Sequence, residues 1–268
     1  MAGSNEALPR LCFLGLILCL CYSSAAAAST PDLLYLNLLW PGGYCQSVNL
    51  GENCCIPTTG EPAADFLVQS LETYDSSTGN PITNCNSHCR FLINPLVDLI
   101  EDLFAYWPNL SCPSNNGMEQ WKHVWCTYGN CTSLSEVVYF NRTLLLREQA
   151  NILATLKSRG IVPDASVTYN LKDITEALAT TLGSSSFSVE CERRYTAWPL
   201  LYQDYLTRIR ICVSSDATTF VTCPTDLPTN CGNKVKFAPI LYPSSLGRQG
   251  DATANPVRLP SALKDAFL

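Results

Sequence analysis

The chain contains 268 residues, is 47% hydrophobic and has a formal net charge of −6. This length is sufficient for one sizeable hydrophobic core. The acidic balance excludes avid, nonspecific binding to polyanions, although it does not exclude a local basic cleft.

The N-terminal segment has the organisation of a secretory signal peptide. A short region ending in Arg10 is followed by an apolar run, Leu11–Cys21, and then by the small residues Ala25–Ala28. The apolar run is too short to span a membrane, and no later stretch qualifies as a span. We therefore predict that residues 1–28 are removed and that the mature protein has no membrane anchor.

Cysteine usage agrees with a secretory route. Of the 15 cysteines, Cys12, Cys19 and Cys21 lie in the signal peptide, which leaves 12 in the mature chain. An even number of cysteines in a secreted protein predicts a disulfide framework. Zinc is the alternative, but paired Cys-x-x-Cys units are missing, so we expect no metal and no other cofactor. Three N-glycosylation sequons are present, at Asn109, Asn130 and Asn141.

The first half of the mature chain contains two predicted strands and one predicted helix. Leu33–Trp40 is an apolar run that ends at a Pro-Gly-Gly turn, which predicts a buried strand. Phe66–Leu71 is the next predicted strand, after a cysteine-rich loop. Asn94–Trp107 places apolar residues at helical spacing and is therefore predicted to be a helix.

Two further helices are predicted from their end signals. Ser133–Glu136 matches a capping box, which predicts a long helix that stops at Gly160. Asn170 is predicted to cap a shorter helix that ends at Gly183.

The second half of the chain also contains a predicted hairpin and a tail. Thr207–Val213 and Thr218–Thr222 alternate like half-buried strands and are predicted to pair. Residues 29–243 are therefore expected to form one α+β domain. Residues 244–268 have little apolar periodicity and no cysteine, so we expect a mobile tail.

The segment Trp121–Cys131 combines a histidine with aromatic residues and reads Trp-Lys-His-Val-Trp-Cys-Thr-Tyr-Gly-Asn-Cys. It resembles the second active-site segment of the ribonuclease T2 family, Trp-x-His-Glu-Trp-x-Lys-His-Gly-Thr-Cys. The residues that match are Trp121, His123, Trp125, Gly129 and Cys131. The family's glutamate, lysine and second histidine fall on Val124, Thr127 and Tyr128.

The resemblance extends from about Leu33 to Pro239 and includes segments that look like plant S-like members of the family. These segments are Leu38–Cys45, Cys54–Gly60, Pro62–Phe66, Trp107–Pro113, Ile211–Val213 and Cys223–Pro224. The likeness implies the family's α+β fold, an antiparallel sheet flanked by helices and cross-linked by disulfides.

The resemblance also implies five disulfides, namely Cys45–Cys54, Cys55–Cys112, Cys85–Cys131, Cys191–Cys231 and Cys212–Cys223. Cys89 and Cys126 are additional to that pattern. They lie four and five residues from Cys85 and Cys131 respectively, so antiparallel segments joined by that bond would bring them together. We therefore predict a sixth bond, Cys89–Cys126. Two unpaired thiols are the alternative, which an oxidising compartment disfavours.

Enzymes of this family cleave RNA by moving the 2′-hydroxyl onto the adjacent phosphate, which requires one imidazole to accept a proton and another to donate one. The first histidine lies in Phe-x-x-His-Gly-Leu-Trp-Pro, which here reads Phe66–Thr73 with Gln69 in its place. Tyr128 occupies the second position, and a phenol with a pKa near ~10 is a poor base at neutral pH. Glu72 replaces the tryptophan and adds a charge that repels phosphate. The sequence thus predicts a degenerate active site.

His123 is the retained histidine, at a position to which the family gives phosphate contact rather than proton transfer. We expect it to be vestigial, and packing beside Trp121 and Trp125 is favoured over phosphate binding. His88 is the other histidine of the chain and is predicted to be an exposed loop residue.

Three functional hypotheses follow. The first is a catalytically inactive homologue that serves as a storage, stress-related or binding protein. The second is a weak endoribonuclease that binds RNA and cleaves it through a 2′,3′-cyclic phosphate. The third is a recognition module for a nucleotide, a sugar or a protein. Asn255–Leu259 resembles the Asn-Pro-Ile-Arg-Leu sorting signal of plant vacuolar proteins, so the expected destination is extracellular or vacuolar.

Overall fold

The computed structural model describes residues 30–47, 54–195, 202–224 and 227–242. The predicted signal peptide and the predicted tail with its sorting signal lie outside these ranges. Within the described ranges, no helix combines the length and the apolar character needed to cross a membrane.

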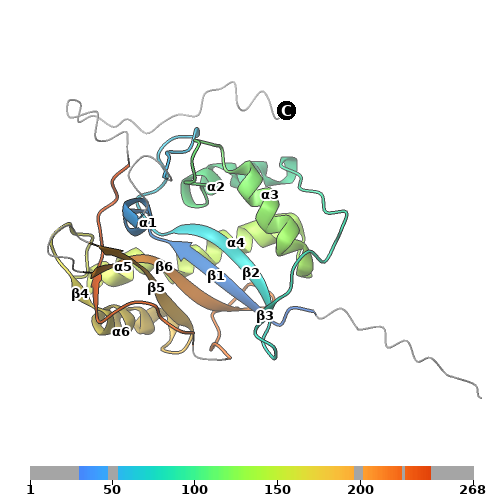
Figure 1. Cartoon of the computed structure of the whole chain (residues 1–268). Helices are drawn as coiled ribbons and strands as arrows, with labels where there is room; N and C mark the ends of the chain where they lie inside the picture. The colour runs from blue at the N-terminus through green and yellow to red at the C-terminus, as the bar shows by residue number, and fades with distance from the viewer. Residues whose placement is uncertain (1–29, 48–53, 196–201, 225–226, 243–268) are drawn as a thin grey trace, which may run out of the picture.

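Seven strands of the described ranges form one sheet (Figure 1). They are β1 (Leu33–Leu39), β2 (Leu67–Asp75), β3 (Asn80–Pro81), β4 (Tyr169–Asn170), β5 (Phe187–Tyr195), β6 (Tyr202–Ser214) and β7 (Lys234–Lys236). The central strand β1 pairs antiparallel with β2 and β6, and β5 pairs antiparallel with β6. The short β7 runs parallel to β6. The predicted α+β class is confirmed, with one parallel pair in a mainly antiparallel sheet.

The helices are distributed unequally over the sheet. They are α1 (Pro41–Ser47), η1 (Asn94–Leu99), α2 (Ile100–Tyr106), α3 (Met118–Thr127), η2 (Gly129–Cys131), α4 (Glu136–Ala150), α5 (Ile152–Ser158) and α6 (Leu171–Leu182). In Figure 1, α4, α5 and α6 lie behind the sheet, where α4 contacts β1 and β2. Helix α3 lies beside β2 and contacts it. Part of the front face is therefore left without a helical cover.

The central strands have one apolar and one polar face. Leu34, Leu36 and Leu38 of β1 are fully buried, as are Ile209 and Ile211 of β6, and they belong to the main hydrophobic core beneath the helices. Because successive side chains of a strand point to opposite faces, the residues between them face the other side of the sheet. That opposite face carries Asn37, Arg208 and Arg210.

The predicted turn after β1 is the start of helix α1. Pro41 is its first residue, a position that suits proline because the missing N–H would have no partner there. Gly43 is required by close packing, since a Cβ at this position would lie 1.8 Å from the carbonyl oxygen of Leu206. Helix α1 therefore rests directly on β6.

The predicted capping box does not form. The N-cap of α4 is Ser135, which makes no side-chain capping bond, and Glu136 instead accepts a hydrogen bond from the Leu92 N–H at 3.0 Å. The predicted single helix to Gly160 is also interrupted, because Asn151 is left-handed with φ 42° and divides it into α4 and α5. The helix predicted after Asn170 does end before Gly183, but Asn170 occupies the N-cap position without a side-chain capping hydrogen bond.

The predicted hairpin of Thr207–Val213 with Thr218–Thr222 forms only near its turn. Phe220 makes an antiparallel bridge to Val213, and the Val221 N–H donates to the Cys212 carbonyl at 3.0 Å. The long antiparallel partner of β6 is β5. Four of the nine residues of this strand are charged, three of them in succession, so it lacks the apolar character by which buried strands are recognised.

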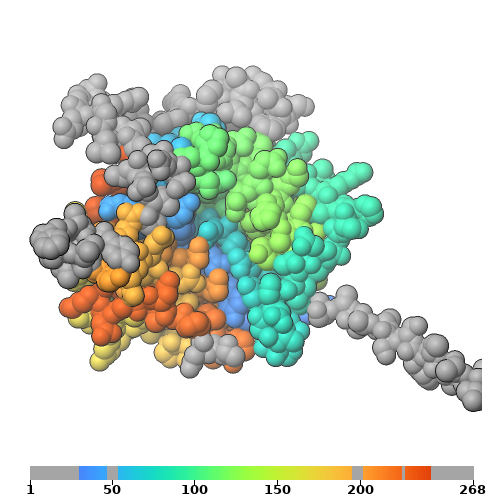
Figure 2. Space-filling model, viewed as in Figure 1, coloured from blue at the N-terminus to red at the C-terminus, as the bar shows by residue number. Residues whose placement is uncertain are grey.

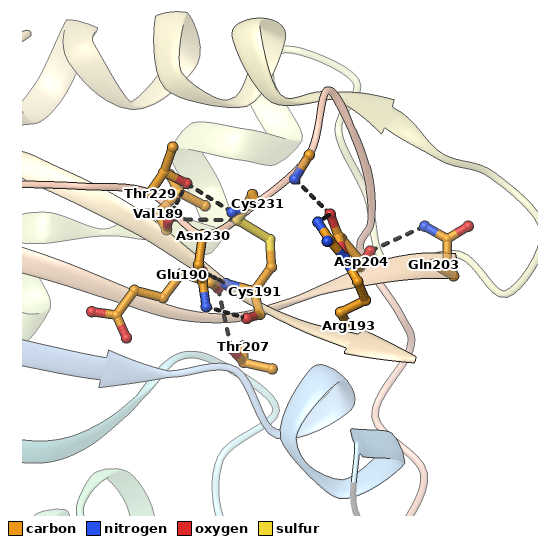
Figure 3. Close-up of a disulfide and its surroundings, with 11 residues drawn as sticks. Val189, Glu190, Cys191, Arg193, Gln203, Asp204, Thr207, Thr229, Asn230 and Cys231 are labelled. Atoms are coloured by element: carbon orange, nitrogen blue, oxygen red, sulfur yellow. Dashed lines mark hydrogen bonds and ion pairs between the residues drawn. A yellow bond between two sulfur atoms is a disulfide. The ribbon is translucent and has the colours of Figure 1, made fainter. Parts of the chain in front are cut away.

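The described residues form six disulfides with Cα–Cα distances of 5.0 to 5.6 Å. Their pairs are those given above, including Cys89–Cys126 at 5.6 Å. Figure 3 shows Cys191–Cys231, where the Asn230 side chain pairs with the strand backbone. The Asn230 amide accepts from the Cys191 N–H and donates to its carbonyl, both at 2.8 Å. The segment before β7 is thereby held on β5.

Candidate functional site

Gln69 lies in a β-bulge of β2. The pairing with β1 shifts between Asn37, which faces Ser70, and Leu38, which faces Val68, so Gln69 is the additional residue. A bulge bends the strand locally and redirects the side chain of the extra residue. The Gln69 carbonyl accepts hydrogen bonds from side chains on the helical side, each at 3.3 Å. These donors are Trp107 Nε1 and Gln120 Nε2.

Helix α3 is oriented by two buried tryptophans. The indole N–H of Trp121 donates to the Trp107 carbonyl at 2.7 Å, and that of Trp125 donates to the Arg90 carbonyl at 3.0 Å. Trp121, Val124 and Trp125 are buried on one face of the helix, which places His123 on the exposed side. The packed interpretation of His123 was therefore wrong, because its helical position directs it away from the core.

A cleft of about 180 Å³ lies between α3 and the polar face of the sheet. Its lining residues come from β1, β2, α3 and β6 and are Asn37, Gln69, Ser70, Glu72, Gln120, His123, Val124, Tyr128, Arg208 and Arg210. In Figure 2 the surface is hollowed between the green helical side and the orange β6, with blue residues of β1 between them. The cleft thus collects residues from distant parts of the chain.

Besides Glu72, four of the five other residues predicted at the family's active-site positions line this cleft. They are Gln69, His123, Val124 and Tyr128. Thr127 does not line the cleft. Its backbone carbonyl accepts a hydrogen bond from the Asn84 N–H at 2.8 Å. His88, the second histidine, is exposed in its loop, as predicted, and does not line the cleft.

Two arginines of the cleft are tied into a network by Glu190. Arg208 donates to Gln69 Oε1 at 2.6 Å and to the Glu190 carboxylate at 2.7 Å. Arg210 donates to Asn37 Oδ1 at 3.0 Å and lies 3.6 Å from the other oxygen of Glu190. The three charged side chains are only 21–29% exposed, so their interactions are less screened than those of surface pairs. One carboxylate thereby bridges both guanidinium groups.

A second carboxylate, Glu72, lies at the Tyr128 side of the cleft. It accepts a hydrogen bond from Ser70 Oγ at 2.8 Å. Burial raises the pKa of Tyr128, the negative charge of Glu72 raises it further, and Arg210 opposes the shift. Burial and Glu72 also raise the pKa of Tyr74 to about 12. Tyr128 is therefore protonated at neutral pH and cannot serve as a general base there.

Arg208 and Arg210 were not predicted as site residues. The sequence did contain a signal for them, because the side chains of two arginines separated by one residue in an alternating strand must point to the same face of the sheet. Glu190 could not be predicted in the same way, since the strand that carries it was not recognised. Among the described residues, no group of three or more His, Cys, Asp or Glu side chains could hold a metal ion.

The chain matches the model of the ribonuclease T2 family over residues 31–223. It is 38% identical to Ribonuclease 3 of Arabidopsis thaliana, over 77% of this chain and 89% of the relative. It is 28% identical to the ribonuclease-like storage protein of Panax ginseng, over 86% and 83% of the two chains. The crystal structure of RNase NT in complex with 5′-AMP is similar, with a TM-score of 0.69, 31% identity and coverage of 79% of this chain and 100% of that chain. The chain belongs to the ribonuclease T2 family.

Proposed function

We propose that this protein is a ribonuclease T2 homologue that does not cleave RNA and serves in the secretory pathway as a storage, stress-related or binding protein. The observation that carries this proposal is the pair Gln69 and Tyr128, which line one cleft at the two positions where the chemistry requires imidazoles. An amide side chain exchanges no proton, and Tyr128 holds its proton because its pKa is raised. The ginseng storage protein is a precedent, by its name, for such a role in this family.

The electrostatics of the cleft also disfavour phosphoryl chemistry. The two arginines carry two positive charges, and Glu72 with Glu190 supplies two negative charges, so the formal sum is zero when His123 is neutral. Stabilisation of a phosphorane requires donors that are free to follow its developing charge. Here the guanidinium groups are already held by Glu190, Gln69 and Asn37.

The exposed His123 favours weak RNA or nucleotide binding as a second candidate. It lines the cleft beside Gln120 and is not covered by the tryptophans of α3. RNase NT, a structural relative, is described in complex with 5′-AMP. In this second candidate function the cleft binds a nucleotide, and any residual cleavage of RNA would depend on His123 alone.

A ribonuclease assay with the mature, purified protein tests the proposal. We expect no turnover of homopolymer RNA at neutral pH beyond that of a preparation carrying His123→Ala, which reports contaminating nuclease. Turnover that His123→Ala abolishes would favour the weak endoribonuclease. Saturable binding of AMP without turnover, measured by calorimetry, would favour the binding module over storage.

The destination of the protein is a separate part of the proposal. A fluorescent fusion of the whole chain is expected to enter the secretory pathway and to reach the vacuole through Asn255–Leu259. Val257→Gly combined with Leu259→Gly should divert it to the medium. Secretion of the unaltered fusion into the medium would contradict the vacuolar destination and support the extracellular one.

A further inference from the structure

Asn109 lies at the rim of a second pocket that adjoins the cleft. This pocket holds about 70 Å³, and its lining includes Leu39, Tyr44, Asn109 and Ser111. Gln69 and Gln120 line both this pocket and the cleft. A group attached to Asn109 would therefore stand beside the entrance to the proposed binding site.

The chain directly after Asn109 is held in place. Leu110 is 3% exposed, and its carbonyl accepts from the Cys55 N–H at 2.8 Å. Cys112, shortly after it, forms a disulfide with Cys55. Ser111 donates its backbone N–H to Asn109 Oδ1 at 2.9 Å. The direction of the Asn109 side chain is consequently fixed relative to the pocket.

The three sequons differ in the freedom of their amide nitrogen. Asn130 is partly buried and donates through Nδ2 to the Cys126 carbonyl at 3.0 Å. Asn141 is exposed on α4, which covers the opposite face of the sheet. Asn109 Nδ2 has no hydrogen bond within the described part of the chain, because only its oxygen is engaged. Asn109 is thus the sequon residue whose free nitrogen lies at the cleft side.

We propose that Asn109 carries an N-linked glycan and that this glycan caps the small pocket and the adjoining end of the cleft. In the transfer, Asn109 Nδ2 bonds to C1 of the first sugar of a lipid-linked oligosaccharide diphosphate. The bond from C1 to the diphosphate oxygen breaks, the diphosphate leaves with the electron pair, and Nδ2 releases one proton. A cap at this position restricts entry of long polymers more than entry of a mononucleotide.

The inference requires passage through the secretory pathway, which is part of the proposed function, but it does not require the absence of catalysis. Glycopeptide mass spectrometry of the protein purified from plant tissue is the first measurement. We expect Asn109 to be modified. An unmodified Asn109 with a glycan at Asn141 would overturn the inference and keep the secretory route, whereas no glycan at any of the three sequons would overturn both.

Substitutions at Ser111 test the cap without touching Asn109. The Ser111 side chain is exposed, and the hydrogen bonds of this residue to Asn109 and Asn115 are made by its backbone. Ser111→Ala should therefore remove the sequon and leave the loop intact. Ser111→Thr keeps the sequon and is the matched control. Asn141→Gln is the control for a glycan on the other face.

Hydroxyl-radical footprinting of Tyr44 then reports access to the pocket, with Tyr169 on the distant β4 as the internal reference. We expect Ser111→Ala to increase the oxidation rate of Tyr44 several-fold relative to Tyr169. Ser111→Thr and Asn141→Gln should leave the ratio unchanged. An equal Tyr44 rate in the unaltered protein and in Ser111→Ala would show that no glycan covers the pocket.

Discussion

The two faces of the central sheet follow different rules. Leu36 and Ile211, neighbours across β1 and β6, are fully buried under the helices, where any change of volume disturbs the packing. On the opposite face, the equally adjacent pair Asn37 and Arg210 belongs to a polar network that lines the cleft. The core face specifies the fold, whereas the cleft face carries Gln69 and Tyr128, which we propose to stand in place of the family's catalytic histidines. Under this proposal, the catalytic function is separable from folding within the same strands.

The largest expected effect is the recovery of catalysis on the cleft face. Gln69→His, Tyr128→His and Val124→Glu together restore the residues that the family uses, and one acid–base group contributes about 10² to 10⁴ in rate. We expect the triple variant to cleave homopolymer RNA at a rate raised by at least about 10² over the unaltered protein. An inert triple variant that still folds would mean that Thr127, Glu72 or the shape of the cleft also prevents catalysis.

On the core face, substitutions should affect stability instead. Leu36→Ala removes a fully buried side chain and leaves a cavity, so we expect a loss of about 2–5 kcal/mol in the free energy of unfolding. Leu145→Ala on α4 is the matched control, because Leu145 is 47% exposed and its loss should stay within about 0.5 kcal/mol. Denaturant unfolding monitored by tryptophan fluorescence measures both. Similar losses at the two positions would contradict the division into faces.

The Cys89–Cys126 bond joins α3 to the loop that follows β3, next to the cleft side of the fold. It lies inside a region already closed by Cys85–Cys131, so its removal by paired alanine substitutions should cost about 2–3 kcal/mol, the lower half of the usual range. Amide hydrogen exchange should rise in α3 and in the loop, and remain slow in β1. Peptide mapping under non-reducing conditions that found both thiols free would remove the basis of this prediction.

Much of the fold and part of the site followed from the sequence. The strand β1, the helix from Asn170 and the even set of cysteines were readable because each depends on local spacing or on a retained motif. The break at Asn151 was not, because one left-handed residue interrupts a pattern that otherwise continues through α5. The exposure of His123 was readable in principle, since Trp121, Val124 and Trp125 already define the buried face of that helix.

The polar network was the least predictable part, because it depends on pairing between distant strands. Glu190 faces Arg208 across β5 and β6, and Gln69 reaches Arg208 only because a bulge releases it from the ladder. Neither the pairing nor the bulge leaves a local mark in the sequence. The sequence therefore predicted residues that line the cleft, such as Gln69 and Tyr128, but not the hydrogen bonds and ion pairs that the arginines make there.

A smaller effect, on the affinity of the cleft for anions, is expected when Arg208 and Arg210 lose their ionic contacts with the Glu190 carboxylate. Glu190→Gln removes the charge that bridges Arg208 and Arg210, so we expect a several-fold increase in affinity for AMP or inorganic phosphate, with a steeper dependence on salt. Glu192→Gln, an exposed residue of the same strand, is the matched control for net charge and should have little effect. Calorimetric titration at low and physiological salt measures the difference. Equal affinities in the two variants would mean that Glu190 does not suppress anion binding.

The smallest expected effect concerns a charge at the far end of β6, on the core side of the sheet. Asp204 is 6% exposed and is bonded by Arg193 at 2.8 Å and by the Gly232 N–H, next to the disulfide shown in Figure 3. The hydrogen bond from Arg193 is the main cause that holds the pKa of Asp204 below its ordinary value of 3.8, and burial opposes it. A carboxylate with a lowered folded-state pKa stabilises the fold above its unfolded pKa, and this contribution is lost as the pH falls through the folded value. Asp204→Asn should therefore lower the melting temperature modestly at pH 7, and the difference from the unaltered protein should shrink as the pH falls below 3.8 and through the lower folded-state pKa. A constant difference across this range would show that Asp204 acts through packing and not through its charge, and would leave the cleft as the part of β6 where charge matters.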